Sequence, residues 1–230
     1  MYNDGRYLST NPTWHEDDAA WKASQVLSLL RDRNFKPESV VDVGCGTGGV
    51  LEVIADAVNG VRLVGYDPSS QAIGLVERSD RVELRVGTPE EINEHFDLLL
   101  SLDVFEHVED YLGFLRSLRP IADWFVFHIP LDISAQSVAR ENPLLAVRSS
   151  CGHLHYFTRS TALASLQTAG FQIACERLLF PNEMPGKGAK TRLANIPRRL
   201  VRRLSPQLSA RILGGFTLLV LASRPTEKSG

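Results

Sequence analysis

Residues 40–50 read VVDVGCGTGGV and combine three structural signals in one short stretch. The apolar run at residues 39–43 predicts a buried strand, and the apolar positions of residues 48–59 recur at helical spacing. Between the two, glycines let the backbone approach a ligand closely and direct free N–H groups toward it. The stretch therefore predicts a strand, a binding loop and a helix, in that order.

The rest of the chain continues this alternation of strands and helices. Strand-like runs lie at residues 61–66, 81–86, 96–102, 124–129, 171–180 and 214–224. Helical patterns lie between several of them, and the one at residues 160–170 ends on a glycine suited to a helix C-terminus. Such alternation is typical of an α/β fold with a parallel sheet and crossover helices.

The composition favours a single domain. The chain has 230 residues, of which 43% are hydrophobic and 23% charged, as in ordinary globular proteins. Within residues 1–230 we expect an N-terminal cap at 1–36 with an amphipathic helix over 16–33, a core at 37–180, and a basic insertion at 181–214 before the last strand.

The N-terminus lacks the cationic and apolar regions of a signal peptide, and the apolar run FTLLVLA at residues 216–222 is too short to cross a bilayer. Cys45, Cys151 and Cys175 are widely spaced and form no Cys-x-x-Cys pair, which argues against a disulfide framework or a thiolate metal site. We therefore expect a soluble protein of the reducing cytoplasm.

The glycine loop fits two cofactors. Gly44, Gly46 and Gly49 have the spacing of a dinucleotide site, whereas Gly44, Gly46 and Gly48 have that of a loop for S-adenosylmethionine. Asp67, at the end of the second strand, can accept both hydroxyls of an adenosine ribose in either case. These features together specify an adenosine-type nucleoside in a Rossmann-like site.

Three features separate the two cofactors. Asp42 lies two residues before Gly44, where it can receive the ammonium of an amino acid moiety and would repel a pyrophosphate. A Tyr-x-x-x-Lys pair is absent, so short-chain dehydrogenase chemistry has no catalytic residues here. The fourth strand, finally, leads into the stretch SLDVFEHVED.

Taken jointly, VVDVGCGTG, GYDPS, FDLLLSLDVFEHV and FTLLVLASR resemble the class I S-adenosylmethionine-dependent methyltransferases. The Asp-x-x-Glu-His-Val form at 103–108 is similar to the branch that includes ubiquinone-type and many small-molecule O-methyltransferases. The resemblance runs from about Ser39 to Arg224. It implies a Rossmann-like seven-stranded sheet of order 3-2-1-4-5-7-6 with the last strand antiparallel.

The resemblance also implies cofactor positions. By this resemblance, Asp42 and the glycines of the loop bind the methionine end of the cofactor, and Asp67 binds its ribose. Thr88 lies where the family often has an acid beside the adenine amine. The full set comprises Asp42, Gly44, Cys45, Gly46, Gly48, Asp67, Pro68, Thr88 and Ser101.

Methyl transfer from a sulfonium is an in-line displacement that depends mainly on positioning, but a hydroxyl of high pKa benefits from a base. Three histidines follow strands at the expected ligand-binding edge: His107, His153 and His155. For His107 the alternative is a helix-start residue that binds backbone or Glu106. For the other two the alternative is loop-stabilising hydrogen bonds.

We expect no metal. A site of His153 and His155 with Asp132 or Asp103 is chemically conceivable, but metal-dependent members of the resembled family use an Asp-Asn pair that this sequence lacks. His128 lies inside a strand and is interpreted as a core residue.

Near the N-terminus, Tyr7, Trp14 and His15 are candidate substrate-binding residues in a lid over the cofactor. The alternative is that these aromatic side chains pack the cap onto the sheet.

Charge is distributed unevenly along the chain. Residues 1–183 hold 26 of the 27 carboxylates but 15 of the 25 Lys and Arg, whereas no carboxylate occurs from Met184 to Thr226. The basic stretch 187–213 has three interpretations: a solvated helix, a surface for an anionic or lipid-linked substrate or a membrane, or a subunit contact. Nucleic acid is disfavoured because no aromatics interleave with the arginines.

From the sequence we therefore predict an S-adenosylmethionine-dependent methyltransferase of a small molecule, with a sugar or secondary-metabolite hydroxyl as the acceptor. Two alternatives stay open, an NAD(P)-dependent oxidoreductase and a non-catalytic nucleoside-binding module.

Overall fold

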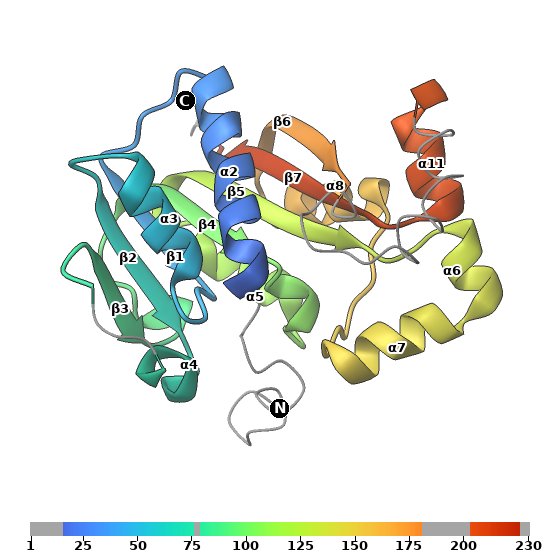
Figure 1. Ribbon diagram of the computed structural model, residues 1–230, viewed down its shortest axis with the longest axis horizontal. Coiled ribbons are helices and arrows are strands. Elements are labelled where there is room, and N and C mark those ends of the chain that lie inside the picture. Colours follow the sequence, from blue (N-terminus) through green and yellow to red (C-terminus); the bar gives the residue numbers. More distant parts are fainter. Residues whose placement is uncertain (1–15, 76–78, 181–202, 226–230) are drawn as a thin grey trace, which may run out of the picture.

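The computed structural model describes residues 16–75, 79–180 and 203–225, and its centre is one seven-stranded sheet (Figure 1). The strand order is β3-β2-β1-β4-β5-β7-β6. Strands β1 to β5 pair in parallel, and β7 is antiparallel to both β5 and β6, so the expected topology is confirmed. The strands are β1 (Ser39–Val43), β2 (Arg62–Asp67), β3 (Val82–Val86), β4 (Phe96–Leu102), β5 (Ala122–Leu131), β6 (Gln172–Leu179) and β7 (Phe216–Ser223).

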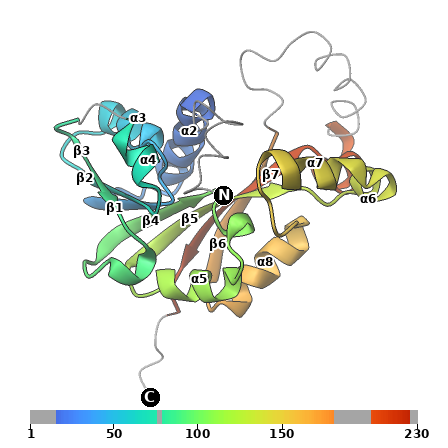
Figure 2. The ribbon, with the colours of Figure 1, turned by 90° about the horizontal axis from the view of Figure 1, so that it is seen from below.

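Helices cover both faces of the sheet, with α2, α3 and α4 on one face and α5 and α8 on the other (Figure 2). Two short 3-10 turns, η1 (Pro89–Glu91) and η2 (Phe105–His107), follow β3 and β4. The described helices are α2 (Glu16–Asp32), α3 (Gly49–Ala57), α4 (Ser70–Gly74), α5 (Tyr111–Leu118), α6 (Ala135–Arg140), α7 (Asn142–Ser150), α8 (Arg159–Thr168) and α11 (Pro206–Leu213).

The alternation of side chains along the strands produces two separate apolar cores. Val41 of β1 and Leu99 of β4 belong to the core beneath α5 and α8. Their chain neighbours Val40 and Leu98 belong to the core beneath α2 and α3. Buried on both faces, these strands read as the near-continuous apolar runs seen in the sequence.

The N-terminal helix packs as part of this layered structure. Ala23 and Val26 of α2 are fully buried in the same core as α3. At the other end of α2, Arg177 of β6 donates a hydrogen bond to Ser28 (3.1 Å) and forms an ion pair with Asp32. Helix α2 is thus attached to the protein at two places, through the core that it shares with α3 and through Arg177 of β6.

The segment after β5 departs from the expected pattern. The sequence predicts a strand at 124–129, but β5 runs from Ala122 to Leu131, because β4 pairs with it from Ala122 onward and β7 pairs with it as far as Leu131. Helices α6 and α7 follow, and α7 contains no buried residue. Without a buried face, a helix leaves no apolar periodicity in the sequence, so α7 gave no signal.

The C-terminal part of the basic insertion forms α11. Pro206 is its first residue, and the Ser205 side chain caps it by accepting a hydrogen bond from the Leu208 N–H (3.2 Å). A proline is well placed there because the first helical N–H needs no partner within the helix. The remainder of the insertion, up to residue 202, lies outside the described residues.

Candidate active site

The loop after β1 has the backbone conformation that its glycines predict. Gly44, Gly46 and Gly48 have positive φ angles of 84°, 57° and 80°. At Gly44, a Cβ atom would lie 2.5 Å from Cγ2 of Val104, so the loop after β1 packs directly against the loop after β4. Glycine is required there for both conformation and space.

Asp67 holds this loop in place. Its Oδ2 accepts a hydrogen bond from the Gly46 N–H (2.9 Å), and its Oδ1 accepts one from the Ser69 N–H (2.8 Å). Burial raises the pKa of the carboxyl, while the two backbone donors lower it. A carboxylate offers about four acceptor sites, so capacity for ribose hydroxyls remains.

Asp42, at the end of β1, is 2% exposed, and its Oδ1 has no hydrogen-bond partner within the described part of the chain. Burial raises the pKa of this carboxyl to about 7, and the nearby ammonium of Lys22 acts in the opposite direction. Because Asp42 is then only partly ionised at neutral pH, it repels a diphosphate less strongly than the sequence argument assumes.

Lys22 of α2 reaches from the cap to the end of β4. Its Nζ lies 2.8 Å from Oδ2 of Asp103, whose Oδ1 lies 2.6 Å from Nδ1 of His128. Although burial opposes it, the charges of His128 and Lys22 hold the pKa of Asp103 well below its usual range. Asp103 has a φ of 58°, a conformation that non-glycine residues seldom adopt and that often marks functional sites.

A second polar cluster follows directly along the chain. Glu106 is fully buried, and its burial and the charges of Asp103 and Asp132 raise its pKa well above the usual range. The rings of His107 and His153 meet edge to face with centroids 4.9 Å apart. Nδ1 of His153 lies 2.7 Å from Oδ2 of Asp132, which fixes the orientation of that ring.

The fold brings this cluster together through backbone contacts. The carbonyl oxygen of Glu106 accepts hydrogen bonds from the N–H groups of Leu154 (2.8 Å) and His155 (3.0 Å). The loop after α7 is therefore attached to the turn after β4. This attachment places His153 beside His107, although 45 residues separate them in the sequence.

The three candidate histidines differ in their surroundings. Nε2 of His155 lies 3.0 Å from the carbonyl oxygen of Val108 and 3.1 Å from that of Glu109, and its ring packs on Tyr111. Such contacts match the loop-stabilising alternative for His155. His153 engages a carboxylate through Nδ1, an arrangement that leaves Nε2 as the acceptor nitrogen of a neutral ring.

The remaining predicted cofactor residues lie along the same edge. Pro68 and Thr88 are exposed and lie just after the ends of β2 and β3. The two strand ends are joined by a hydrogen bond from the Gly87 N–H to the carbonyl oxygen of Asp67 (3.1 Å). The Thr88 N–H donates to Glu91 (2.7 Å).

Two further candidates are less exposed. The Oγ of Ser101 is buried and has no hydrogen-bond partner among the residues that the structure describes. Cys45 lies inside the glycine loop, and burial raises the pKa of its thiol.

The lid candidates Tyr7, Trp14 and His15 lie outside the described residues, so their positions give no information on the substrate site. The same holds for the part of the basic stretch before residue 203.

One group of three side chains in the described residues brings candidate metal-ligand atoms close together. Glu106, His107 and His153 each present a ligand atom, and these atoms lie within 4.8 Å of one another. The set differs from the one weighed in the sequence, because His155 bonds to carbonyl oxygens and Asp103 to Lys22. A polar group of a bound small molecule can use the same donors and acceptors.

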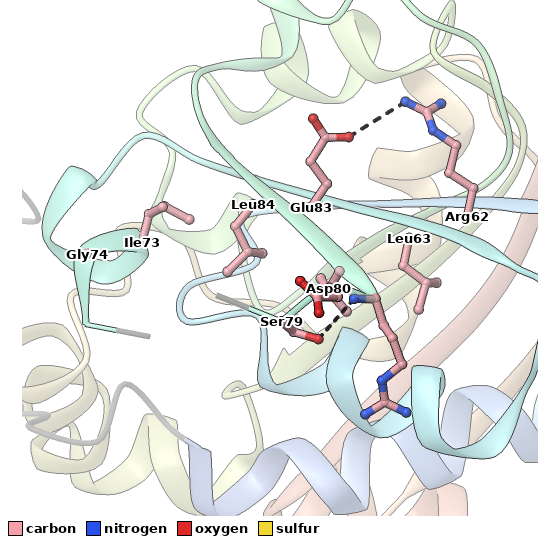
Figure 3. Close-up of a pocket in the computed structure, with 10 residues that line it drawn as sticks. Arg62, Leu63, Ile73, Gly74, Ser79, Asp80, Glu83 and Leu84 are labelled. Atoms are coloured by element: carbon pink, nitrogen blue, oxygen red, sulfur yellow. Dashed lines mark hydrogen bonds and ion pairs between the residues drawn. The ribbon is translucent and has the colours of Figure 1, made fainter. Parts of the chain in front are cut away.

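A cavity of about 730 Å³ lies elsewhere, at the starts of β2 and β3 (Figure 3). Its guanidinium groups are already paired, Arg62 with Glu94 and Arg81 with Asp56. The side chain of Leu84 lines the cavity and also packs against Gly48. Leu84 thus lies between this cavity and the glycine loop, and the two guanidinium groups of the cavity are engaged within the protein.

Sequence reasoning did not find Lys22, and it did not find the complete burial of Glu106. A signal for Lys22 does exist: it lies three residues after Ala19 and four before Val26, on the buried side of α2. A lysine on an apolar face needs an anionic partner, but only the fold identifies that partner as Asp103.

Comparison with known proteins gives a consistent result at the family level. A family model described as "Methyltransferase domain" matches residues 14–176, more than half of the chain. The ubiquinone biosynthesis O-methyltransferase of Azorhizobium caulinodans is 39% identical over 92 residues, 36% of this chain and 36% of that protein. That of Rhizobium leguminosarum bv. trifolii is 28% identical over 185 residues, 74% of this chain and 73% of that protein.

The chain spans only 36% to 44% of the length of three such ubiquinone biosynthesis O-methyltransferases that it matches, those of Azorhizobium caulinodans and of two strains of Rhizobium etli. Among solved structures, magnesium protoporphyrin IX methyltransferase from Synechocystis PCC 6803 with bound SAH has a TM-score of 0.59 at 16% identity, covering 90% of this chain and 83% of that one. The plantazolicin methyltransferase BpumL has a TM-score of 0.61 at 15% identity, covering 95% and 88%. These structural similarities concern the fold.

Proposed function

We propose that the chain, which belongs to the methyltransferase domain family, is an S-adenosylmethionine-dependent methyltransferase that methylates a hydroxyl oxygen of a small molecule. The left-handed glycine loop tied to Asp67 supports an adenosine-type cofactor, and the match to the methyltransferase family model is the observation that favours methyl transfer. The relatives named ubiquinone biosynthesis O-methyltransferases favour oxygen as the acceptor atom. A sugar or secondary-metabolite hydroxyl remains our preferred acceptor class.

We assign the cofactor to the edge formed by β1, β2 and the glycine loop. Asp67 would accept the ribose hydroxyls, and the exposed residues Pro68 and Thr88 would hold the adenine. The ammonium of the methionine end binds near Asp42, whose Oδ1 lacks a hydrogen bond within the described chain. Lys22, close to the same carboxyl, supplies a positive charge for the methionine carboxylate.

S-adenosylmethionine supplies a methyl group on a sulfonium sulfur, and its displacement requires nucleophile, methyl and sulfur in line. We assign the base to His153. With Asp132 ionised, the Nδ1 proton of His153 is donated to that carboxylate at 2.7 Å, so Nε2 is free to accept the hydroxyl proton as the carbon–oxygen bond forms.

The neighbours of His153 then have supporting roles. The buried carboxyl of Glu106, whose two oxygens have no hydrogen-bond partner in the described part of the chain, contacts the acceptor, and His107 orients the base through the ring contact at 4.9 Å. His155 positions the loop through its two carbonyl contacts. We place the enzyme in the cytoplasm. An oxidoreductase or a non-catalytic nucleoside module has no comparable support, because the matched family model is that of a methyltransferase.

The cofactor assignment is tested without knowledge of the acceptor. Asp67→Ala should weaken binding of S-adenosylhomocysteine by about 1.5 to 3 kcal/mol, as expected for lost charge-assisted hydrogen bonds. Asp56→Ala is the matched control, because that carboxylate is 70% exposed and pairs with Arg81 on the surface. Equal calorimetric affinities for wild type and Asp67→Ala would refute the ribose assignment.

The base is tested with an acceptor found by incubating the enzyme with pools of hydroxylated sugars and phenols and detecting methylated products by mass spectrometry. His153→Ala should lower turnover about 10²- to 10⁴-fold while the affinity for S-adenosylhomocysteine stays unchanged. His95→Ala serves as a control because that side chain is 45% exposed at the opposite end of β4. Wild-type turnover in His153→Ala would remove His153 from the reaction.

A further inference from the structure

The outer surface of α11 carries apolar side chains that no described part of the protein covers. Leu208 and Ile212 are 48% and 44% exposed and, four residues apart, share one side of the helix. Leu204, just before the helix cap, is 87% exposed. We call these three residues the α11 apolar surface.

The other side of α11 faces the protein. Ser209 is fully buried and Ala210 is 8% exposed, and the helix packs against α6. At its C-terminal end, a Cβ on Gly214 would lie 2.8 Å from Oγ of Ser134, which caps α6. Small residues thus attach the helix to the fold, while its large aliphatic residues point away from it.

Positive charge surrounds this surface. Arg203 and Arg211 are exposed, and within residues 16–75, 79–180 and 203–225 no carboxylate forms an ion pair with either guanidinium. The sequence from Met184 to Thr226 holds nine Lys and Arg and no carboxylate. An aliphatic surface bordered by arginines is complementary to a partner that is both apolar and anionic.

We propose that the α11 apolar surface docks onto an anionic membrane surface. In that position α11 lies in the plane of the bilayer, with Leu208 and Ile212 at the acyl boundary and Arg203 and Arg211 at the phosphate headgroups. No described helix is long and apolar enough to cross a membrane, so the contact is peripheral. Residues 203–213 contain no aromatic side chain for base stacking, which argues against nucleic acid.

This inference does not depend on the methyl acceptor. The test is co-sedimentation of the full chain with vesicles of phosphatidylcholine alone or with about one third phosphatidylglycerol. We expect binding only to the anionic vesicles, weakened by salt because the arginine contribution is screened. Leu208→Ser with Ile212→Ser should lower the partition coefficient roughly 10-fold or more, because apolar area no longer enters the bilayer.

Arg203→Gln with Arg211→Gln should lower the partition coefficient roughly 30-fold, because each charge near the anionic surface contributes about 1 kcal/mol to binding. Leu75→Ser is the matched apolar control: Leu75 is 56% exposed and follows α4, at the opposite end of the molecule from α11 (Figures 1 and 2). Arg31→Gln with Arg33→Gln, at the end of α2, removes the same charge elsewhere. Both control variants should bind as wild type does.

Circular dichroism of every variant verifies that the fold is retained. The proposal is overturned if wild type fails to bind anionic vesicles, or if the α11 variants bind as well as the controls. It is also overturned if three results occur together: wild type is a dimer, wild type does not bind vesicles, and the variant Leu208→Ser with Ile212→Ser is a monomer. That result would make the α11 apolar surface a contact between two copies of the chain.

Discussion

The protonation of Asp42 should make cofactor binding depend on pH. With a pKa of about 7 in the ligand-free protein, this carboxyl is mostly protonated at pH 5.5 and mostly ionised at pH 7.5. A bound ammonium group favours the ionised form. Binding below pH 7 must therefore release the proton of Asp42, and the free energy of that release is subtracted from the affinity.

The magnitude follows from the pKa. If the bound ammonium lowers the pKa of Asp42 well below 5, the affinity is proportional to the fraction of ligand-free protein in which Asp42 is ionised. The affinity therefore falls by the same factor as this fraction. Between pH 7.5 and pH 5.5 that factor is about 25, or roughly 2 kcal/mol at about 1.4 kcal/mol for each tenfold change. Over this range the α-amino group of the ligand, with a pKa of about 8, stays largely protonated.

Isothermal titration calorimetry with S-adenosylhomocysteine measures this dependence directly. Titrations in two buffers of different ionisation enthalpy should report the release of close to one proton at pH 5.5. Asp42→Asn should bind more weakly at pH 7.5 but with little dependence on pH, whereas Asp56→Asn, a surface control, should retain the wild-type slope. S-adenosylmethionine should give the same slope, because both ligands carry the ammonium.

Two results would contradict this reasoning. An affinity that is constant within about twofold from pH 5.5 to pH 7.5 in wild type would mean that Asp42 does not change protonation on binding. An Asp42→Asn variant that retains the slope would assign the titration to another group. Either outcome would separate the methionine ammonium from Asp42.

Three further perturbations test the energetics of the same edge. Asp42→Asn should stabilise the ligand-free protein by up to about 4 kcal/mol above pH 7. The reason is that the folded pKa of Asp42, about 7, exceeds its unfolded value, so the wild-type protein loses stability as pH rises through 7. In chemical denaturation, the gain of the variant over wild type should vanish below about pH 4. Gly44→Ala should destabilise far more than Gly60→Ala, because both have positive φ but a Cβ meets Val104 only at Gly44; thermal melts that shift equally would refute the packing argument. Lys22→Ala removes the ammonium from Asp103, which keeps His128 as a partner, and should destabilise the protein by about 1.5 to 3 kcal/mol; an unchanged urea midpoint would contradict the ion pair.

Much of the fold was readable from the sequence because its signals are local. Strands β1 and β4 begin and end at the predicted residues, since buried parallel strands are short apolar runs with clear ends. Gly44, Gly46 and Gly48 were identified because left-handed backbone conformations favour glycine at fixed places. The sheet order itself came from the resemblance, because strand pairing is a long-range property.

What only the tertiary structure decided is the chemistry between distant segments. The pairing of Lys22 with Asp103 and the contact of His153 with Asp132 depend on how far α2 and the loop after α7 reach over the sheet. The pKa values of Asp42 and Glu106 depend on burial, and the burial of a residue is not determined by its neighbours in the sequence. The sequence by itself therefore determined which acids and histidines stand at the strand ends, and the packing of remote elements decided which of them are charged, paired or free to react.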